Sequence, residues 1–310
     1  MKSSGVLKFN CDNRILLIVV LITVAGASIV ASSSSYFAAA KFSDPYFLLK
    51  RHMLRIFIAA IFLVLAINVD YRFYRRLSPV ALALGICLLF GLFLYGFAIR
   101  HSLRWYHIKY FSMTLQPSEF ARLALVMFLA FWISMRGKEF TDFKKGFLPA
   151  ALAIVCVVSL MAAQPNYGTA SATALIAFAL LFIGGARLIH LGGLVLVTGM
   201  VTAFKVWSAP YVRERLLAFL DKGEDLRAAN WQVHQSLIAL GSGGIFGTGI
   251  GESQQKLSWL PDSHTDFIFS IIGEEAGLVG TLLVSLLFLL FVLRALKIAY
   301  QCGDRFGELL

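Results

Sequence analysis

Long apolar runs dominate this sequence and limit what the chain can fold into. Each run is roughly 20 residues long, which is the length that a helix needs to cross the hydrocarbon core of a bilayer. The sequence therefore predicts an all-α polytopic membrane protein with about eight transmembrane helices. The predicted spans lie at 15–34, 53–69, 80–99, 118–135, 147–164, 169–186, 188–206 and 267–293.

The composition excludes the main alternatives to a membrane protein. Of the 310 residues, 59% are hydrophobic and 15% are charged. In soluble domains roughly 45–50% of the residues are apolar and about 25% are charged. The mean hydropathy is +0.77. One water-soluble core could not bury so many apolar side chains, so a soluble enzyme, a disordered chain and a disulfide scaffold are excluded. The cysteines form no C-x-x-C pair, which favours free thiols; they are Cys11, Cys87, Cys156 and Cys302.

The distribution of Lys and Arg predicts the orientation of the chain. If the N-terminus is cytoplasmic, the predicted cytoplasmic segments carry more Lys and Arg than the short outer loops, as the positive-inside rule requires. The net charge of +11 is then a sign of membrane orientation rather than of nucleic-acid binding. The first apolar run is long and more spans follow, which favours a retained anchor over a cleaved signal peptide. The long loop 207–264 falls on the outer face, where we expect any site.

Charged side chains inside the predicted spans are candidate functional residues, because charge in a bilayer is costly. Glu119 and Arg122 lie three residues apart on one helix face, so they either pair with each other or line a polar cavity. Glu274 and Glu275 must face protein or water rather than lipid. They either pack against another helix or belong to a site.

The long outer loop contains a glycine-rich run at 241–251. It lacks the G-x-G-x-x-G spacing and any G-K-[ST] sequence, so we expect a turn that packs on helices rather than a nucleotide-binding loop. After it, Ser263 and Asp266 fit a helix capping box. Asp266 is equally well placed to act as a general base at the membrane surface, and both interpretations stay open on the residues alone. His264 is either a second proton carrier or a polar interfacial residue.

Basic side chains on the predicted outer side are candidates for binding an anionic group, because guanidinium groups suit bidentate phosphate contacts. Taken one at a time, most of them could equally be solvated loop charges. They are Arg104, Arg213, Arg215 and Lys256.

Several motifs, in this order along the chain, resemble the SEDS family (shape, elongation, division and sporulation), which includes FtsW, RodA and SpoVE. The motifs are Gln-Pro-Ser-Glu at 116–119, Gln-Pro-Asn-Tyr-Gly-Thr at 164–169 and the run 232–280, which contains His-Thr-Asp-Phe-Ile-Phe and Gly-Glu-Glu-x-Gly-Leu. The resemblance covers nearly the whole chain. The early segment 44–51 looks more like the FtsW branch than the RodA branch.

The resemblance implies a peptidoglycan glycosyltransferase of the bacterial inner membrane that polymerises lipid II at the division septum, with its active site on the outer face. The family's essential extracellular aspartate aligns with Asp266, which would be the general base. The implied partners are a class B penicillin-binding transpeptidase, other division proteins and membrane lipids, with no nucleic acid. A divalent cation, Mg²⁺ or Mn²⁺, is the one cofactor expected. A supporting polar cavity would contain Gln116, Glu119, Arg122, Gln164, His264, Glu274 and Glu275, and the pyrophosphate would contact Arg104, Arg213, Arg215 and Lys256.

The chain departs from the family pattern at several points. Asn166 replaces the usual Asp, and Arg122 replaces the usual Lys. The family has ten spans, so we expect 1–310 to be a single membrane domain that lacks the last two transmembrane helices. Two other functions stay open: a lipid II flippase, which would use the charges within the spans, and a non-catalytic division scaffold.

Overall fold

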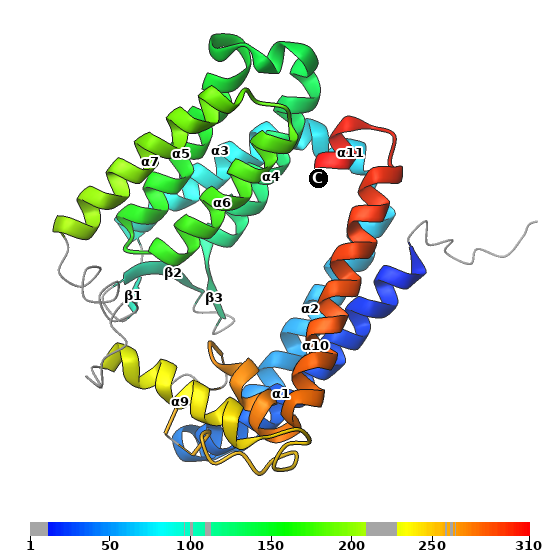
Figure 1. Ribbon diagram of the computed structural model, residues 1–310, viewed down its shortest axis with the longest axis vertical. Helices are drawn as coiled ribbons and strands as arrows, with labels where there is room; N and C mark the ends of the chain where they lie inside the picture. Colours follow the sequence, from blue (N-terminus) through cyan, green and yellow to red (C-terminus); the bar gives the residue numbers. More distant parts are fainter. Residues whose placement is uncertain are drawn as a thin grey trace, which may run out of the picture. The chain divides into compact units, whose positions relative to one another are not determined.

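The computed structural model describes residues 12–95, 97–99, 102–108, 113–208, 228–257, 259–260, 263 and 265–310. Contacts divide the chain into two compact units. Unit 1 comprises Met1–Val69 and Lys205–Lys297, and unit 2 comprises Asp70–Phe204 and Ile298–Leu310. Figure 1 labels the elements of both units. The prediction that residues 1–310 form one membrane domain stays a prediction.

Unit 1 contains three long helices and one shorter helix. They are α1 (Asn13–Phe42), α2 (Phe47–Asn68), α9 (Ala228–Ser242) and most of α10 (Ile268–Gln301), and α1 packs against α2. Asp12 begins α1 by accepting hydrogen bonds from the amides of Arg14 and Ile15 at 2.9 and 3.2 Å, as an N-cap residue does. The same carboxylate pairs with Arg294 of α10, so one residue both starts α1 and ties it to α10. Helix α9 lies in the predicted long loop and was not expected.

Unit 2 is a helical bundle around a core of aliphatic side chains. Its helices are α3 (Tyr71–Tyr95), α4 (Pro117–Arg136), α5 (Leu148–Ala163), α6 (Tyr167–Ile183), α7 (Leu188–Ser208) and α11 (Arg305–Leu309), and two short turns are η2 (Gly137–Thr141) and η3 (Phe143–Phe147). Small residues let helices approach closely. A Cβ on Gly85 of α3 would lie 3.1 Å from the Cα of Ala121 in α4. Phe306 of α11 is fully buried in the same core.

A small antiparallel sheet joins α3 to α4, in a segment expected to be partly a span and partly a loop. Its strands are β1 (Phe97–Ile99), β2 (Ser102–Ile108) and β3 (Met113–Leu115), in the order β1-β2-β3. The hydroxyl of Tyr106 donates a hydrogen bond to the carbonyl of Leu88 at 3.0 Å, and burial raises the pKa of that hydroxyl. The predicted bounds 80–99 of the third span are therefore wrong, because α3 begins nine residues earlier and ends before β1.

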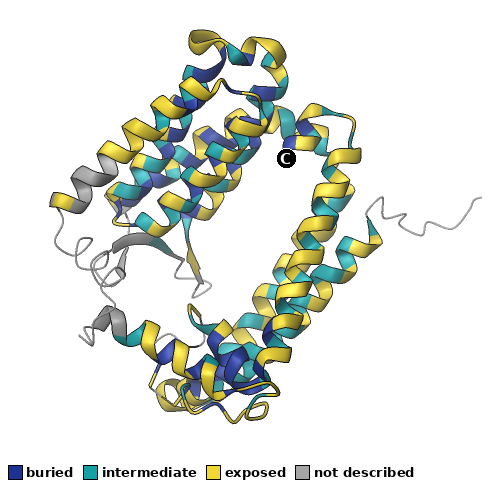
Figure 2. Ribbon diagram, viewed as in Figure 1, coloured by how far each residue is buried: buried dark blue, intermediate teal, exposed yellow. Residues whose placement is uncertain are grey.

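The predicted fold class is confirmed as a polytopic helical membrane protein, with the sheet as an addition. Each predicted span overlaps a helix, and the number of spans stays a prediction. Figure 2 shows buried residues between the helices of unit 2, whereas much of α1, α2 and α10 is exposed or intermediate. Many of the exposed residues are large hydrophobic ones. Five helices among the described residues are long and apolar enough to cross a membrane: Asn13–Phe42, Tyr71–Leu94, Pro117–Thr141, Phe143–Ala163 and Ile268–Gln301.

Candidate functional site

A break in α10 is the central feature of the candidate site in unit 1. At Gly277 the backbone leaves the helical conformation, with φ 65° and ψ −160°. An L side chain rarely adopts this φ, and a Cβ here would lie 2.4 Å from the backbone nitrogen of Gly247. Only glycine meets both conditions. The break leaves the carbonyls of Glu274 and Glu275 without the amide partners that a continuous helix would supply.

The glycine-rich run supplies the missing partners through its own backbone. In a continuous helix the amides of residues 278 and 279 would bind those two carbonyls. Instead the run lies between these two amides and these two carbonyls, and each of the four groups forms a hydrogen bond with the backbone of the run. The bonds run from Thr248 N to Glu274 O (2.9 Å), Gly249 N to Glu275 O (3.1 Å), Leu278 N to Gly244 O (2.9 Å) and Val279 N to Ile245 O (3.2 Å). The prediction that this run packs on helices is confirmed.

Two glycines of the run are needed because two backbones meet at these points without space for side chains. A Cβ on Gly243 would lie 1.9 Å from the carbonyl oxygen of Gly273, and one on Gly247 would lie 2.1 Å from that of Glu275. Gly247 also has a φ of +83°. Close packing therefore explains the glycines at these two positions.

A buried ion pair lies beside the break and joins three segments of unit 1. The Lys256 ammonium is 3.0 Å from Oε1 of Glu275, and both side chains are 7% exposed. Ser32 of α1 donates its hydroxyl to both oxygens of Glu275, at 2.6 and 2.8 Å. Lys256 also donates to the carbonyl of Gly251. Because a buried charge is costly unless it is paired and hydrogen-bonded, these contacts hold α1, the loop and α10 together.

The neighbouring Glu274 is bound separately. Its Oε2 accepts a hydrogen bond from the Ser253 hydroxyl at 2.5 Å, and its Oε1 accepts one from the Gln254 amide at 2.8 Å. The side chain is buried. The expectation that Glu274 and Glu275 face protein rather than lipid is confirmed, and both serve to fix the loop that precedes α10.

Asp266 lies in the turn just before α10, which begins at Ile268. Its side chain is exposed, whereas Ser263, three residues earlier, is buried. Within the described residues, no hydrogen bond joins the Asp266 carboxylate to the first turn of α10. The predicted capping box needs a helix that begins directly after Ser263, whereas α10 begins at Ile268, so the structure favours an accessible carboxylate over the capping role. Asp266 is positioned by α10, and the contacts of Glu274 and Glu275 hold the first part of α10 in place.

Five of the other predicted site residues belong to unit 2. Gln116 precedes α4 in an extended conformation. Glu119 and Arg122 form an ion pair with each other, which is the simpler of the two readings offered by their spacing. Gln164 is buried after α5 and donates its side-chain amide to the carbonyl of Leu89 at 2.9 Å. Its Oε1 has no hydrogen-bond partner among the described residues. Arg104 lies in β2, and its side chain is outside the described part.

The remaining predicted residues, Arg213, Arg215 and His264, lie outside the described residues, so their roles stay predictions. Ser32 and Ser253 were missed. Ser32 belongs to a run of serines at 32–35 inside an otherwise apolar stretch, and that polar run was the available signal. In the described ranges, no group of three or more His, Cys, Asp or Glu residues could hold a metal ion. The thiols of Cys87, Cys156 and Cys302 are free.

Comparison with known proteins agrees with the sequence motifs. Residues 12–310 match the family described as cell cycle protein, FtsW/RodA/SpoVE. A probable peptidoglycan glycosyltransferase FtsW from Geobacter metallireducens is 36% identical over 277 residues, which cover 88% of this chain and 73% of that protein. Stage V sporulation protein E from Bacillus subtilis is 36% identical over 272 residues, 86% of this chain and 73% of that protein.

Solved structures agree on the fold. One comes from work on the structural coordination of polymerization and crosslinking by a peptidoglycan synthase complex. It matches with a TM-score of 0.75 and 23% identity, over 98% of this chain and 82% of that chain. The rod shape determining protein RodA from Thermus thermophilus matches with a TM-score of 0.67 and 22% identity, over 98% of this chain and 79% of that chain. Motifs, sequence relatives and fold agree, and the chain belongs to the FtsW/RodA/SpoVE family of cell cycle proteins.

Proposed function

We propose that this protein is a peptidoglycan glycosyltransferase that polymerises lipid II into glycan strands during cell division. The relatives named FtsW support the activity and the division role. The observation that carries the proposal is the placement of Asp266, an exposed carboxylate at the start of a helix that buried contacts hold in position. An accessible base on a rigid support is what a proton-transfer step requires.

In the proposed reaction, Asp266 takes the proton from the 4-hydroxyl of an acceptor GlcNAc. The oxygen then attacks C1 of the MurNAc in a second lipid-linked chain. A new C–O bond forms with inversion at C1, the bond from C1 to the pyrophosphate breaks, and undecaprenyl pyrophosphate leaves with the electron pair. Proton removal by a positioned base typically accelerates such a step by ~10²–10⁴-fold.

The leaving pyrophosphate needs positive charge near it. Arg104, Arg213 and Arg215 stay the proposed contacts. Lys256 fits this role less well, because its ammonium is buried against Glu275, so we assign it to holding the loop. A divalent cation stays a proposed aid in neutralising the pyrophosphate, and no step above passes through it.

The partner protein and the cellular location are also part of the proposal. The solved complex that this chain resembles coordinates polymerization and crosslinking, which supports a class B penicillin-binding transpeptidase as the partner. The positive-inside charge pattern supports an active site on the outer face of the inner membrane, at the septum. A flippase would use the charges within the spans as a polar path, but the described contacts of Glu119, Arg122, Glu274 and Glu275 already pair them.

The test is glycan synthesis from labelled lipid II by the purified chain with its transpeptidase partner. Asp266→Asn should lower polymer formation by at least about 10²-fold, with unchanged melting. Glu252→Gln is the matched control, because Glu252 is another exposed acid of the same loop, and it should keep full activity. Equal polymer from Asp266→Asn and wild type would exclude Asp266 as the base.

A further inference from the structure

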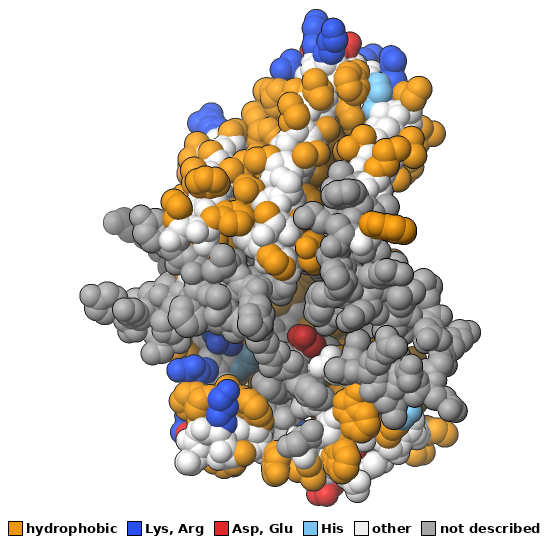
Figure 3. All heavy atoms as spheres, turned by 90° about the vertical axis from the view of Figure 1, so that its left-hand side faces the viewer, with side chains coloured by type: hydrophobic (Ala, Val, Ile, Leu, Met, Phe, Trp, Pro, Cys, Tyr) orange, Lys and Arg blue, Asp and Glu red, His pale blue; other side chains and the backbone are white. Residues whose placement is uncertain are grey.

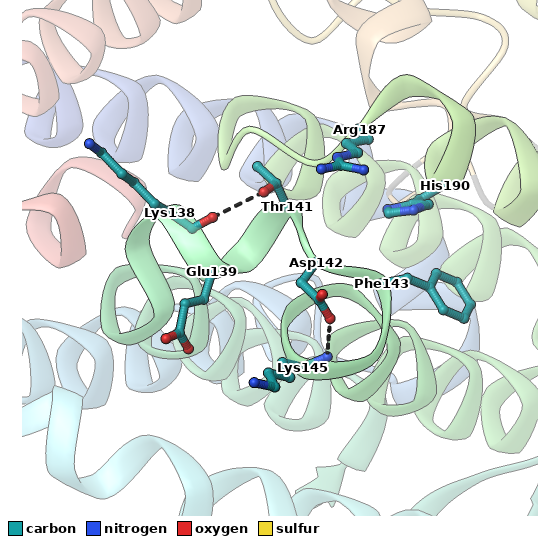
Figure 4. A pocket seen from close by; sticks show the side chains of 8 residues that line it. All are labelled: Lys138, Glu139, Thr141, Asp142, Phe143, Lys145, Arg187 and His190. Carbon is teal, nitrogen blue, oxygen red and sulfur yellow. Dashed lines mark hydrogen bonds between the residues drawn. The ribbon is translucent and has the colours of Figure 1, made fainter.

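A polar pocket lies in unit 2, and its lining contains no residue assigned to the glycosyltransferase site. The turns η2 and η3, between α4 and α5, form one side, and the start of α7 forms the other. The pocket has a volume of about 460 Å³, and its lining includes Lys138, Thr141, Lys145, Arg187 and His190. Figure 4 shows Arg187 and His190 on one side of it, opposite the turn that carries Asp142 and Lys145.

The turn that forms the pocket is held in one conformation by its own hydrogen bonds. Oδ1 of Asp142 accepts bonds from the amides of Lys144 and Lys145, both at 2.9 Å. The indole of Trp132 donates to the carbonyl of Gly146 at 2.8 Å. A Cβ on Gly146 would lie 2.4 Å from the Cα of Phe140, so the turn is also closely packed. The pocket therefore exists before any ligand binds.

Positive charge exceeds negative charge in the lining of the pocket. Lys138, Lys145 and Arg187 are exposed, and none of the three lies within 4 Å of a carboxylate in the described part of the chain. Two acids belong to the same lining. Glu139 lies 3.5 Å from Arg136. Asp142 binds the turn amides, and Lys145 and Arg187 are near enough to lower its pKa.

Apolar surface adjoins the cations. Leu188 and Ile189, at the start of α7, are 72% and 78% exposed. The His190 ring packs against the rings of Phe143 and Phe147, with centroid distances of 5.1 and 5.2 Å. The buried Nδ1 of His190 has no hydrogen-bond partner among the described residues. Figure 3 shows Lys and Arg side chains gathered at this end of unit 2, above a flank of hydrophobic side chains.

We propose that this pocket binds the phosphate headgroup of an anionic membrane phospholipid, whose acyl chains lie along Leu188 and Ile189. Cations at the ends of apolar helices face the headgroup layer of a bilayer, and basic pockets there suit anionic lipids. An acidic peptide would satisfy Lys138, Lys145 and Arg187 but would leave the exposed aliphatic side chains uncovered. The site is independent of the glycosyltransferase proposal.

The test is native mass spectrometry of the full chain in an uncharged detergent, with phosphatidylglycerol as the probe and phosphatidylcholine as the zwitterionic reference. The pocket variant is Lys138→Gln with Lys145→Gln and Arg187→Gln. The matched control is Arg14→Gln with Arg76→Gln and Lys297→Gln, which removes three exposed cations from other predicted cytoplasmic helix ends. Each basic group near an anionic lipid adds roughly fivefold to affinity, so the pocket variant should need at least about tenfold more phosphatidylglycerol for equal occupancy.

The control variant should bind phosphatidylglycerol like wild type, and wild type should prefer it to phosphatidylcholine. An equal loss in both variants, or no loss in either, would overturn the proposal. Displacement of the lipid by millimolar inorganic phosphate would also overturn it, because the site would then bind a free anion. If the triple variant does not fold, Lys138→Gln with Lys145→Gln replaces it, with an expected loss of at least about fivefold.

Discussion

The break in α10 and the turn between α4 and α5 place charged side chains in opposite ways. At the break, Lys256, Glu274 and Glu275 are buried, and each is bound by specific partners. At the turn, Lys138 and Lys145 stay exposed, and neither lies within 4 Å of a carboxylate in the described structure. A charge removed from water must be satisfied by protein, so the first region fixes a backbone. A hydrated charge stays available, so the second region can bind a ligand.

The largest expected effect comes from breaking the buried pair. Glu275→Ala leaves the Lys256 ammonium buried without its counterion, and removal of one partner of a buried pair typically costs about 3–5 kcal/mol. The free energy of unfolding, measured by denaturant titration in a fixed detergent, should fall by that amount. The double variant Glu275→Leu with Lys256→Met should recover most of the loss. If Glu275→Ala unfolds like wild type, the pair does not hold this region.

A smaller effect is expected where the two backbones meet. Gly247→Ala places a Cβ 2.1 Å from the Glu275 carbonyl oxygen, at a φ of +83°. Overpacking and the positive φ together should cost about 2–4 kcal/mol. Gly241→Ala is the matched control, because a Cβ there meets nothing within 4 Å. Equal unfolding of the two variants would contradict the close packing described for the run.

The smallest effect concerns the exposed turn and depends on pH. Hydrogen bonds from the amides of Lys145 and Lys144 and the nearby cations lower the pKa of Asp142 below its usual 3.8. A lowered carboxyl pKa stabilises the fold above the unfolded pKa, and this stability is lost as the pH falls through the lower folded pKa. Asp142→Ala should therefore melt slightly below wild type at pH 7, and the difference should shrink below pH 3.8. A difference that does not change with pH would mean that the charge is not involved.

The membrane-spanning helices could be predicted from the sequence because each apolar run has the length that a helix needs to cross a bilayer. The break at Gly277 could not, because its stability depends on bonds to Gly244 and Ile245, more than 30 residues away. The bounds of α3 were wrong because apolar length was taken for helix length, and α3 begins with the polar residues before Pro79. Glu274 and Glu275 were predicted to face protein, but nothing in the sequence identified Ser32 as a partner of Glu275.

Because the glycine-rich run is inserted at Gly277, α10 is not one continuous helix but two helical segments joined through the run. Its hydrogen bonds pass through a second segment of the chain, and four of them join that segment to α10. The segment before Gly277 cannot tilt without taking the run with it, and the run is anchored to α1 through Lys256 and Ser32. These contacts link the turn that carries Asp266 to α1, so the position of α1 helps to set the position of the carboxylate.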